Sequence, residues 1–334
     1  MTLVLSLLTT RYVMQVADRL VTADGKLIDP ASNKSLIYLA RNAIVAIGYS
    51  GLAYLDGIPT DEWIAQTLWG KELPRHDDGR AVGHVLGMEG RQCIDIGGAI
   101  ERIRSGCENA LRKERVPLKE KFLQITLAGW QWRRVGTRLV SRPILDAVSS
   151  ELQNGNIRCD VDRLPRHWQY ERMLRDGKSC RPFRMVPIPL ATDIPDARTS
   201  DLIARLEPIA HLADTARETL IKEIKKRAVS VPTIGKDCMC ICIPFPSSKV
   251  LEAEYISSGW EPKISAKGEI YSASYSPWII GPASLHAPAI ILGEIHKVQL
   301  GPFIVHLRGP SPPKESGPRL IAASISQNRP PKPT

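Results

Sequence analysis

TLVLSLLTTRYVMQVADRLVTADGKLIDPASNK, residues 2–34, is the stretch of this chain that decides its fold. It contains three polar residues, Thr2, Asp18 and Lys34, each sixteen positions from the next. The Asp-Gly pair within residues 23–26 (ADGK) is a strong turn signal, because aspartate and glycine tolerate the backbone angles of tight hairpins. This turn is centred so that Lys34 would return close to Asp18.

Two largely apolar runs of strand length, residues 3–8 (LVLSLL) and 12–17 (YVMQVA), precede that turn. A reversal centred near Thr10 would pair positions whose numbers sum to about twenty. The sequence therefore predicts a hairpin that places Asp18 across from Thr2. This first reversal contains no glycine, so its turn signal is the weaker of the two.

Thr2 becomes an N-terminal threonine if Met1 is removed, and it then carries both a nucleophile and a base. A threonine hydroxyl needs a neighbouring group to accept its proton, and an α-amino group can do so directly or through a water. The usual α-amine pKa of about 7.7 to 8.0 leaves a neutral fraction at physiological pH. A nearby Lys34 ammonium would lower that pKa by like-charge repulsion, and Asp18 would keep the lysine charged and oriented.

In this arrangement the chain resembles the proteasome β-subunit family, including the bacterial HslV-type and Anbu-type relatives. Thr2, Asp18 and Lys34 match the family's active-site threonine, aspartate and lysine without a gap. Residues 17–22 (ADRLVT) are similar to its second-strand motif, and residues 43–56 (AIVAIGYSGLAYLD) to the strand before its first helix. Threonine is small enough for ordinary methionine removal, so no propeptide is expected.

The resemblance implies further members of the site. Gly48 falls where the family's oxyanion-hole glycine lies, and Thr22 where a threonine aligns the substrate backbone. By position in the resembled fold, the specificity pocket would be bordered by Val21, Ala46 and Ser50. Because Ala46 is small, we expect this pocket to admit a large side chain.

The implied fold is that of an N-terminal nucleophile (Ntn) hydrolase, an α+β protein with a four-layer αββα sandwich. Hydrophobic spacing predicts helices at residues 59–68, 98–113 and 214–227 and strands at residues 122–133 and 233–243. Thr60 is expected to cap the first helix, which has acidic residues in its first turn.

Two segments depart from the family pattern. The serine and aspartate that support the threonine in many proteasome subunits have no clear counterpart here. The nearest segment, residues 230–235 (SVPTIG), offers Thr233 in place of a serine and no aspartate three positions earlier. Residues 141–200 are longer and more irregular than the corresponding family strands.

Composition limits the other classes of function. The 334-residue chain is 43% hydrophobic and 24% charged, as expected of a globular protein, and its seven cysteines indicate a reducing, cytoplasmic setting. No run is long enough to span a membrane, and the opening run lacks the features of a signal peptide. The net charge of +10 is dispersed and no nucleic-acid motif accompanies it, so we expect a solvated surface.

The cysteines Cys238, Cys240 and Cys242 alternate along a predicted strand and would share one face of it. Metal sites usually pair such cysteines with a distant second pair, which this sequence does not offer. Packing in the core is the expectation, and neither a metal nor a cofactor is predicted.

The sequence predicts a proteasome-like domain at residues 1–250, a small β-rich appendage at 251–308 and a proline-rich, disordered tail at 309–334. The predicted function is hydrolysis of peptide amide bonds in a peptide or unfolded protein, within a homo-oligomeric ring or related assembly. Any ATPase unfoldase would be a separate protein, because no phosphate-binding loop is present. A non-catalytic scaffold subunit and an acylase acting on a small amide remain the alternatives.

Overall fold

The computed structural model describes most of the chain. The described residues are 3–9, 11–23, 26–29, 32–70, 84–86, 94–118, 121–135, 137–153, 156–163, 185–188, 201–202, 204–256, 263–264, 270–271, 276–288 and 295–309.

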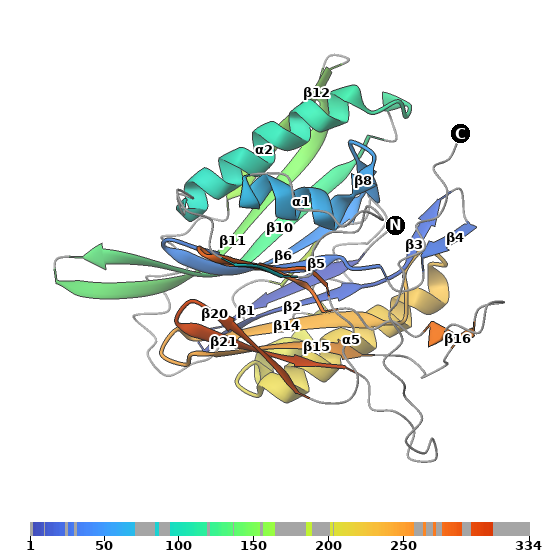
Figure 1. Cartoon of the computed structure of the whole chain (residues 1–334). Helices are drawn as coiled ribbons and strands as arrows, with labels where there is room; N and C mark the ends of the chain where they lie inside the picture. The colour runs from blue at the N-terminus through green and yellow to red at the C-terminus, as the bar shows by residue number, and fades with distance from the viewer. Residues whose placement is uncertain are drawn as a thin grey trace.

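Two large sheets organise these residues (Figure 1). The first sheet has the strand order β13 (Met185–Ile188), β1 (Val4–Leu8), β2 (Tyr12–Asp18), β14 (Cys238–Pro244), β15 (Val250–Ile256), β21 (Phe303–Arg308), β20 (His296–Leu300). The second has the order β12 (Asn156–Arg163), β11 (Arg138–Gln153), β10 (Leu123–Val135), β6 (Ala43–Gly51), β5 (Ser35–Ala40), β18 (Trp278–Ile280), β19 (Ser284–His286), β9 (His84–Leu86). Three small strand pairs complete the β-structure: β3 (Val21–Ala23) with β4 (Lys26–Asp29), β7 (Tyr54–Leu55) with β8 (Ile58–Pro59), and β16 (Lys263–Ile264) with β17 (Ile270–Tyr271).

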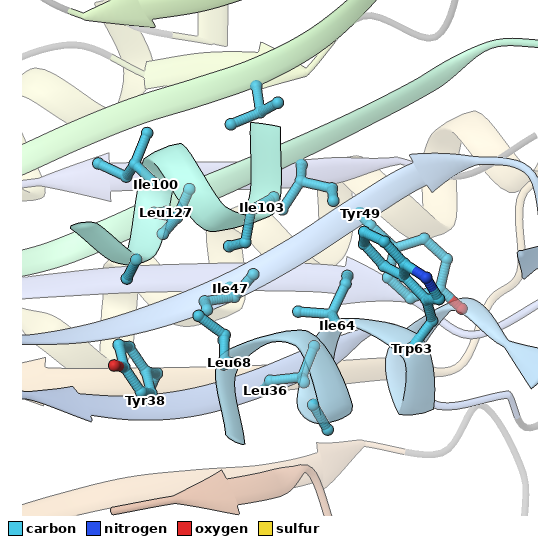
Figure 2. Packing of buried hydrophobic residues seen from close by; sticks show 14 of the residues in the cluster. Leu36, Tyr38, Ile47, Tyr49, Trp63, Ile64, Leu68, Ile100, Ile103 and Leu127 are labelled. Atoms are coloured by element: carbon cyan, nitrogen blue, oxygen red, sulfur yellow. The ribbon is translucent and has the colours of Figure 1, made fainter. Parts of the chain in front are cut away.

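Helices lie on the outer faces of the two sheets (Figure 1). The second sheet packs against α1 (Thr60–Trp69) and α2 (Ile96–Lys113), and the first against α5 (Ala213–Ser230), which follows the short 3₁₀ helix η2 (Glu207–Ile209). Figure 2 shows the contact of α1 and α2 with the second sheet, where Ile64, Leu68 and Ile103 meet Ile47. Each such side chain stabilises the fold by about 1.5 to 3 kcal/mol when fully buried.

The strand alternation explains how one strand serves two cores. Along β6, Val45, Ile47 and Tyr49 join the core under the helices, whereas Ile44 and Ala46 join the core between the sheets. Because successive side chains of a strand point to opposite faces, a fully apolar run is needed where both faces are covered. The run at residues 43–47 meets that need.

The predicted secondary structure is largely confirmed. The three expected helices appear as α1, α2 and α5, and the two expected strands appear as β10 and β14. The predicted cap of α1 is wrong: Pro59 occupies the N-cap position without a side-chain bond, and the Thr60 hydroxyl instead donates to the Leu52 carbonyl at 2.7 Å. Thr60 is thus the first helical residue and not the cap, and its hydroxyl is engaged by the Leu52 carbonyl.

The N-terminal hairpin forms with a register one step from the expected one. Val4 pairs with Ala17 in the β1–β2 ladder, so paired numbers sum to 21. Asp18 consequently lies opposite Leu3, whose carbonyl accepts the Asp18 N–H at 3.0 Å.

Residues 251–308, expected to form a small β-rich appendage, contribute strands to both large sheets. β15 pairs with β14 and β21 runs parallel to β15, while β18 runs parallel to β5. Phe303, Val305 and Leu307 are buried in the core between the sheets. These strands enter the main body because their alternating apolar side chains complete that core. Gly309 ends the described part, and the expected tail beyond it lies outside.

The architecture is mixed α+β, as expected, with most of the regular structure in strands. No described helix is both long and apolar enough to cross a membrane.

Candidate functional site

Asp18, at the end of β2, is the centre of the candidate site. Its side chain is fully buried and its carboxylate accepts hydrogen bonds from three backbone N–H groups. Leu3 donates to Oδ1 at 2.6 Å, and Oδ2 accepts from Leu20 at 3.1 Å and from Gly235 at 2.9 Å. Three such bonds satisfy the buried carboxylate oxygens and fix their orientation. They also join the beginning of the chain, the end of β2 and a segment more than two hundred residues away.

Lys34 supplies the positive charge of the site. Its ammonium lies 3.2 Å from Asp18 Oδ2, and it also donates to the Leu20 carbonyl. Only 1% of the lysine side chain is exposed. Removing one partner of a buried ion pair costs about 3 to 5 kcal/mol, so each of these two side chains depends on the other.

Gly235 is a site residue that the sequence analysis did not single out. A Cβ atom at this position would lie 2.8 Å from Leu20 Cβ and 2.9 Å from the Leu20 nitrogen. The close approach of the two backbones is what allows the Gly235 N–H to reach Asp18. A glycine shortly before a buried strand is the signal that the sequence offers for such a position.

The Thr233 hydroxyl is buried close to this contact in sequence. Its Oγ1 atom has no hydrogen-bond partner among the described residues. A buried hydroxyl without a partner costs about 1 to 3 kcal/mol. Such an atom, two residues from Gly235, offers a hydrogen bond to a group brought near Asp18.

Thr2 itself lies outside the described residues. The first described residue is Leu3, which is bound to Asp18 through both its N–H and its carbonyl. The chain therefore reaches the Asp18–Lys34 pair at the residue that directly follows Thr2 in sequence.

Gly48 lies within β6, beneath the first sheet. A Cβ atom there would come within 2.8 Å of Val4 Cγ1 and 2.9 Å of Gln15 Oε1. A larger residue would push the two sheets apart at this point, so the packing itself accounts for a glycine.

The hydrogen-bonding phase of β6 determines where the Gly48 N–H points. Leu52 donates to the Phe122 carbonyl at 3.0 Å, and the β6–β10 register runs from there without a bulge. Because paired bonds recur at every second residue of an antiparallel ladder, Gly48 exchanges its bonds with Thr126. The two-residue turn between β5 and β6 gives the same phase. An oxyanion role for Gly48 would therefore require a local opening of the β6–β10 pair.

The expected substrate-binding residues lie on two different strands, β6 and β3. Ala46 and Ser50 are buried and lie on the same face of β6 as Gly48, turned toward the first sheet. Val21 and Thr22 begin β3, with a register irregularity between them where they pair with β4. The expected pocket residues thus come from two different sheets.

A second buried carboxylate contacts Asn33, the residue that precedes Lys34. Asp61, in the first turn of α1, accepts from Trp278 Nε1 at 2.8 Å and from Asn33 Nδ2 at 3.5 Å. Burial raises the pKa of Asp61 to about 6. Asn33, the residue before Lys34, therefore donates a hydrogen bond to a carboxyl group whose pKa lies just below neutral pH.

The three alternating cysteines are core residues, as expected. Cys238 and Cys240 are buried against α5, and Cys242 packs beside them. Burial raises the pKa of all three thiols, that of Cys242 to about 12. No cluster of His, Cys, Asp and Glu suited to a metal ion occurs in the described part of the chain.

Comparisons with known proteins find similar structures but no similar sequences. No protein-family model matches the chain, and no characterised protein matches it in sequence. Anbu (ancestral beta-subunit) from Yersinia bercovieri is similar in structure, with a TM-score of 0.41 and 10% identity over 72% of this chain and 81% of that chain. The helical assembly of the Anbu complex from Pseudomonas aeruginosa gives a TM-score of 0.39 and 9% identity over 77% and 87%. Anbu from Hyphomicrobium sp. strain MC1 gives 0.35 and 8% identity over 72% and 82%. These TM-scores lie below 0.5, so the chemistry of the site is derived from the residues of this chain.

Proposed function

We propose that this chain is an N-terminal threonine hydrolase of the proteasome-like type, with the αββα sandwich of the Ntn hydrolases, which cleaves peptide amide bonds. One observation carries the proposal: the buried carboxylate that holds Lys34 also binds the residue directly after Thr2. A polar pair of this kind, bound to the residue that follows Thr2 in sequence, has a clear chemical use if the terminal amine is free.

The proposed reaction begins with Thr2 after removal of Met1. The Thr2 α-amine accepts the proton from Thr2 Oγ as that oxygen bonds to the substrate carbonyl carbon. The tetrahedral intermediate then collapses, the C–N bond breaks, and the amine returns the proton to the leaving nitrogen. Water, deprotonated by the same amine, attacks the carbonyl carbon of the Thr2 ester. The C–Oγ bond then breaks, the acid leaves, and the amine returns the proton to Thr2 Oγ. The amine must be neutral at the start of acylation and again at the start of deacylation.

Lys34 and Asp18 set the protonation of that amine in this proposal. The Lys34 ammonium, held ionised by Asp18, lowers the amine pKa through like-charge repulsion. The unpartnered Thr233 hydroxyl is suited to accept a hydrogen bond from the amine and to orient its lone pair. Thr233 would then fill the role of the missing serine.

Substrate binding is the remaining part of the proposal. Thr22 would align the substrate backbone, and Val21, Ala46 and Ser50 would border the side-chain pocket. The Gly48 N–H would stabilise the oxyanion once β6 and β10 separate at that position, an interaction worth about 3 to 4 kcal/mol for a single donor.

Two measurements test the proposed function together. Intact-mass analysis of the purified full chain should show the loss of Met1, and a β-lactone or epoxyketone probe should label Thr2. Thr2→Ala should abolish both labelling and peptide hydrolysis while the protein stays folded. Retained Met1, or unchanged turnover in Thr2→Ala, would remove the α-amine mechanism.

A further inference from the structure

Three residues next to the bond between Gly235 and Asp18 form a closed triangle of contacts. The Arg19 N–H donates to the Asp237 carbonyl at 3.1 Å, and the Tyr255 hydroxyl donates to Asp237 Oδ2 at 2.9 Å. The Arg19 guanidinium lies over the Tyr255 ring, 4.7 Å from its centroid, which is the geometry of a cation–π contact. Each residue of the triangle therefore contacts the other two.

The triangle joins the same two segments as the bond from Gly235 to Asp18. Arg19 directly follows Asp18, and Asp237 lies two residues after Gly235. The Gly235 N–H can reach Asp18 Oδ2, at 2.9 Å, only while these two segments stay together. A contact that fixes Asp237 against Arg19 therefore also fixes a donor to the Asp18 carboxylate.

The connection between α5 and β14, residues 231–237, depends on such contacts for its placement. It forms neither helix nor strand, and its internal bonds are local, such as that from Ile234 to the Val231 carbonyl at 3.0 Å. A local bond closes a turn but does not tie that turn to the sheet. Segments of this kind open more readily than the strands beside them. The bonds of the triangle are therefore placed where they restrain the site most.

The position of Tyr255 is set by β15. Tyr255 pairs with Met239 of β14, and its side chain is buried in the core between the sheets. β15 itself lies between β14 and β21 in the first sheet (Figure 1). Tyr255 thus transmits a restraint from residues 251–308, which the sequence alone assigned to an appendage, to the end of β2.

We propose that Tyr255 is a positioning residue of the candidate site. Its hydroxyl holds Asp237 and its ring holds Arg19, so that the Gly235 N–H stays on Asp18. The catalytic meaning of this placement rests on the proposed function, in which Asp18 and Lys34 serve Thr2. The placement itself can be measured without any hydrolysis.

A role confined to packing in the core would need only the aromatic ring of Tyr255. Phenylalanine keeps that ring and its face for the Arg19 guanidinium, and it removes only the hydroxyl. Asp237→Ala removes the same hydrogen bond from the other side. Since both substitutions break one contact, the double variant should behave like either single variant.

The matched control is Tyr12→Phe. It removes the hydroxyl of another buried tyrosine of the first sheet, which donates to the Ala210 carbonyl at the same distance, 2.9 Å. The two tyrosine variants should lose similar amounts of global stability, because each loses one buried hydrogen bond. They differ in which segment loses its anchor.

Amide hydrogen exchange of the purified full chain, followed residue by residue, tests the proposal. Tyr255→Phe and Asp237→Ala should each speed exchange of the Gly235 amide about tenfold, and Tyr12→Phe should change it by less than about threefold. The double variant should lie within about threefold of either single variant. The saturating rate constant for β-lactone labelling of Thr2 should fall about fivefold in Tyr255→Phe, since small displacements near a reacting group are costly. The half-saturating probe concentration should stay within about twofold.

Equal acceleration of Gly235 exchange by Tyr255→Phe and Tyr12→Phe would overturn the proposal, because the Tyr255 hydroxyl would then contribute only to global stability. Effects of Tyr255→Phe and Asp237→Ala that multiply in the double variant would also overturn it. Failure of the proposed function has a different signature. Thr2 of the unaltered chain would not react with the probe, while exchange of the Gly235 amide would still respond to Tyr255→Phe.

Discussion

The ammonium of Lys34 lies 3.2 Å from Oδ2 of Asp18, and neither side chain is more than 1% exposed. A fully buried ion pair contributes little net stability compared with apolar side chains of similar size, because both charges lose their hydration. Its presence beside the residue that follows Thr2 therefore favours a chemical use. Measurements of unfolding free energy and of hydrolysis can separate a structural role of this ion pair from a chemical one.

Asp18→Asn should destabilise the protein by about 3 to 5 kcal/mol, since it leaves the Lys34 charge buried without its counter-ion. Asp18→Asn/Lys34→Met removes both charges and keeps a side-chain oxygen for the backbone N–H groups that bind Asp18, so it should recover part of that stability while hydrolysis stays abolished. Chemical denaturation of the three proteins measures the effect. The control is Glu218→Gln, which removes the exposed pair with Lys222 and should change stability by less than about 1 kcal/mol.

Gly235→Ala should lower the free energy of unfolding by about 1 to 3 kcal/mol, because the new Cβ would force the Leu20 backbone away. The shift also lengthens the bond from the residue 235 N–H to Asp18, so reactivity of Thr2 toward a β-lactone should fall. Gly97→Ala in α2 is the control: a Cβ there meets only an ordinary contact at 3.4 Å, and helix propensity favours alanine by up to about 1 kcal/mol. Equal effects of the two substitutions would contradict the steric account.

The stability contributed by Asp61 should fall as pH rises. Its pKa is about 6 in the folded protein against an ordinary value of 3.8, so the folded protein binds the proton more tightly than the unfolded chain does. Ionisation of this buried group therefore destabilises the fold progressively between about pH 4 and about pH 6, by up to about 3 kcal/mol. Asp61→Asn should remove this part of the pH dependence. Unfolding curves of both proteins across that range check it, and a stability difference independent of pH would show that Asp61 is not the titrating group.

Cys238, Cys240 and Cys242 should react slowly with thiol reagents in the folded protein, because burial raises the pKa of each thiol and limits access to it. Peptide mapping after labelling at pH 7.5 should find these sites modified only when denaturant is present. Rapid labelling of Cys240 in the folded state would show that α5 does not cover the strand in solution.

Local sequence patterns predict the elements that form within short stretches. The hairpin of residues 4–18 and the helix α2 follow from apolar periodicity, and the predicted register of the hairpin lies within one residue of the observed one. The cap at Thr60 is not formed because Pro59 competes for the same position.

Contacts between distant segments lie beyond such patterns. The bond from Gly235 to Asp18 spans 217 positions, and nothing in the local sequence of either residue specifies its partner. The placement of β18 beside β5 is unpredictable for the same reason, since a short strand at residues 278–280 can pair with any open edge. Only the complete set of core contacts selects one arrangement.

The bond between Asp18 and Gly235 also determines when the site can exist during synthesis. The carboxylate is available early, but its third N–H donor and the strand β14 that pairs with β2 emerge only after most of the chain has been translated. A nascent chain on the ribosome therefore lacks the assembled surroundings of Asp18. The surroundings of Asp18 can therefore form only after Gly235 and β14 have been synthesised.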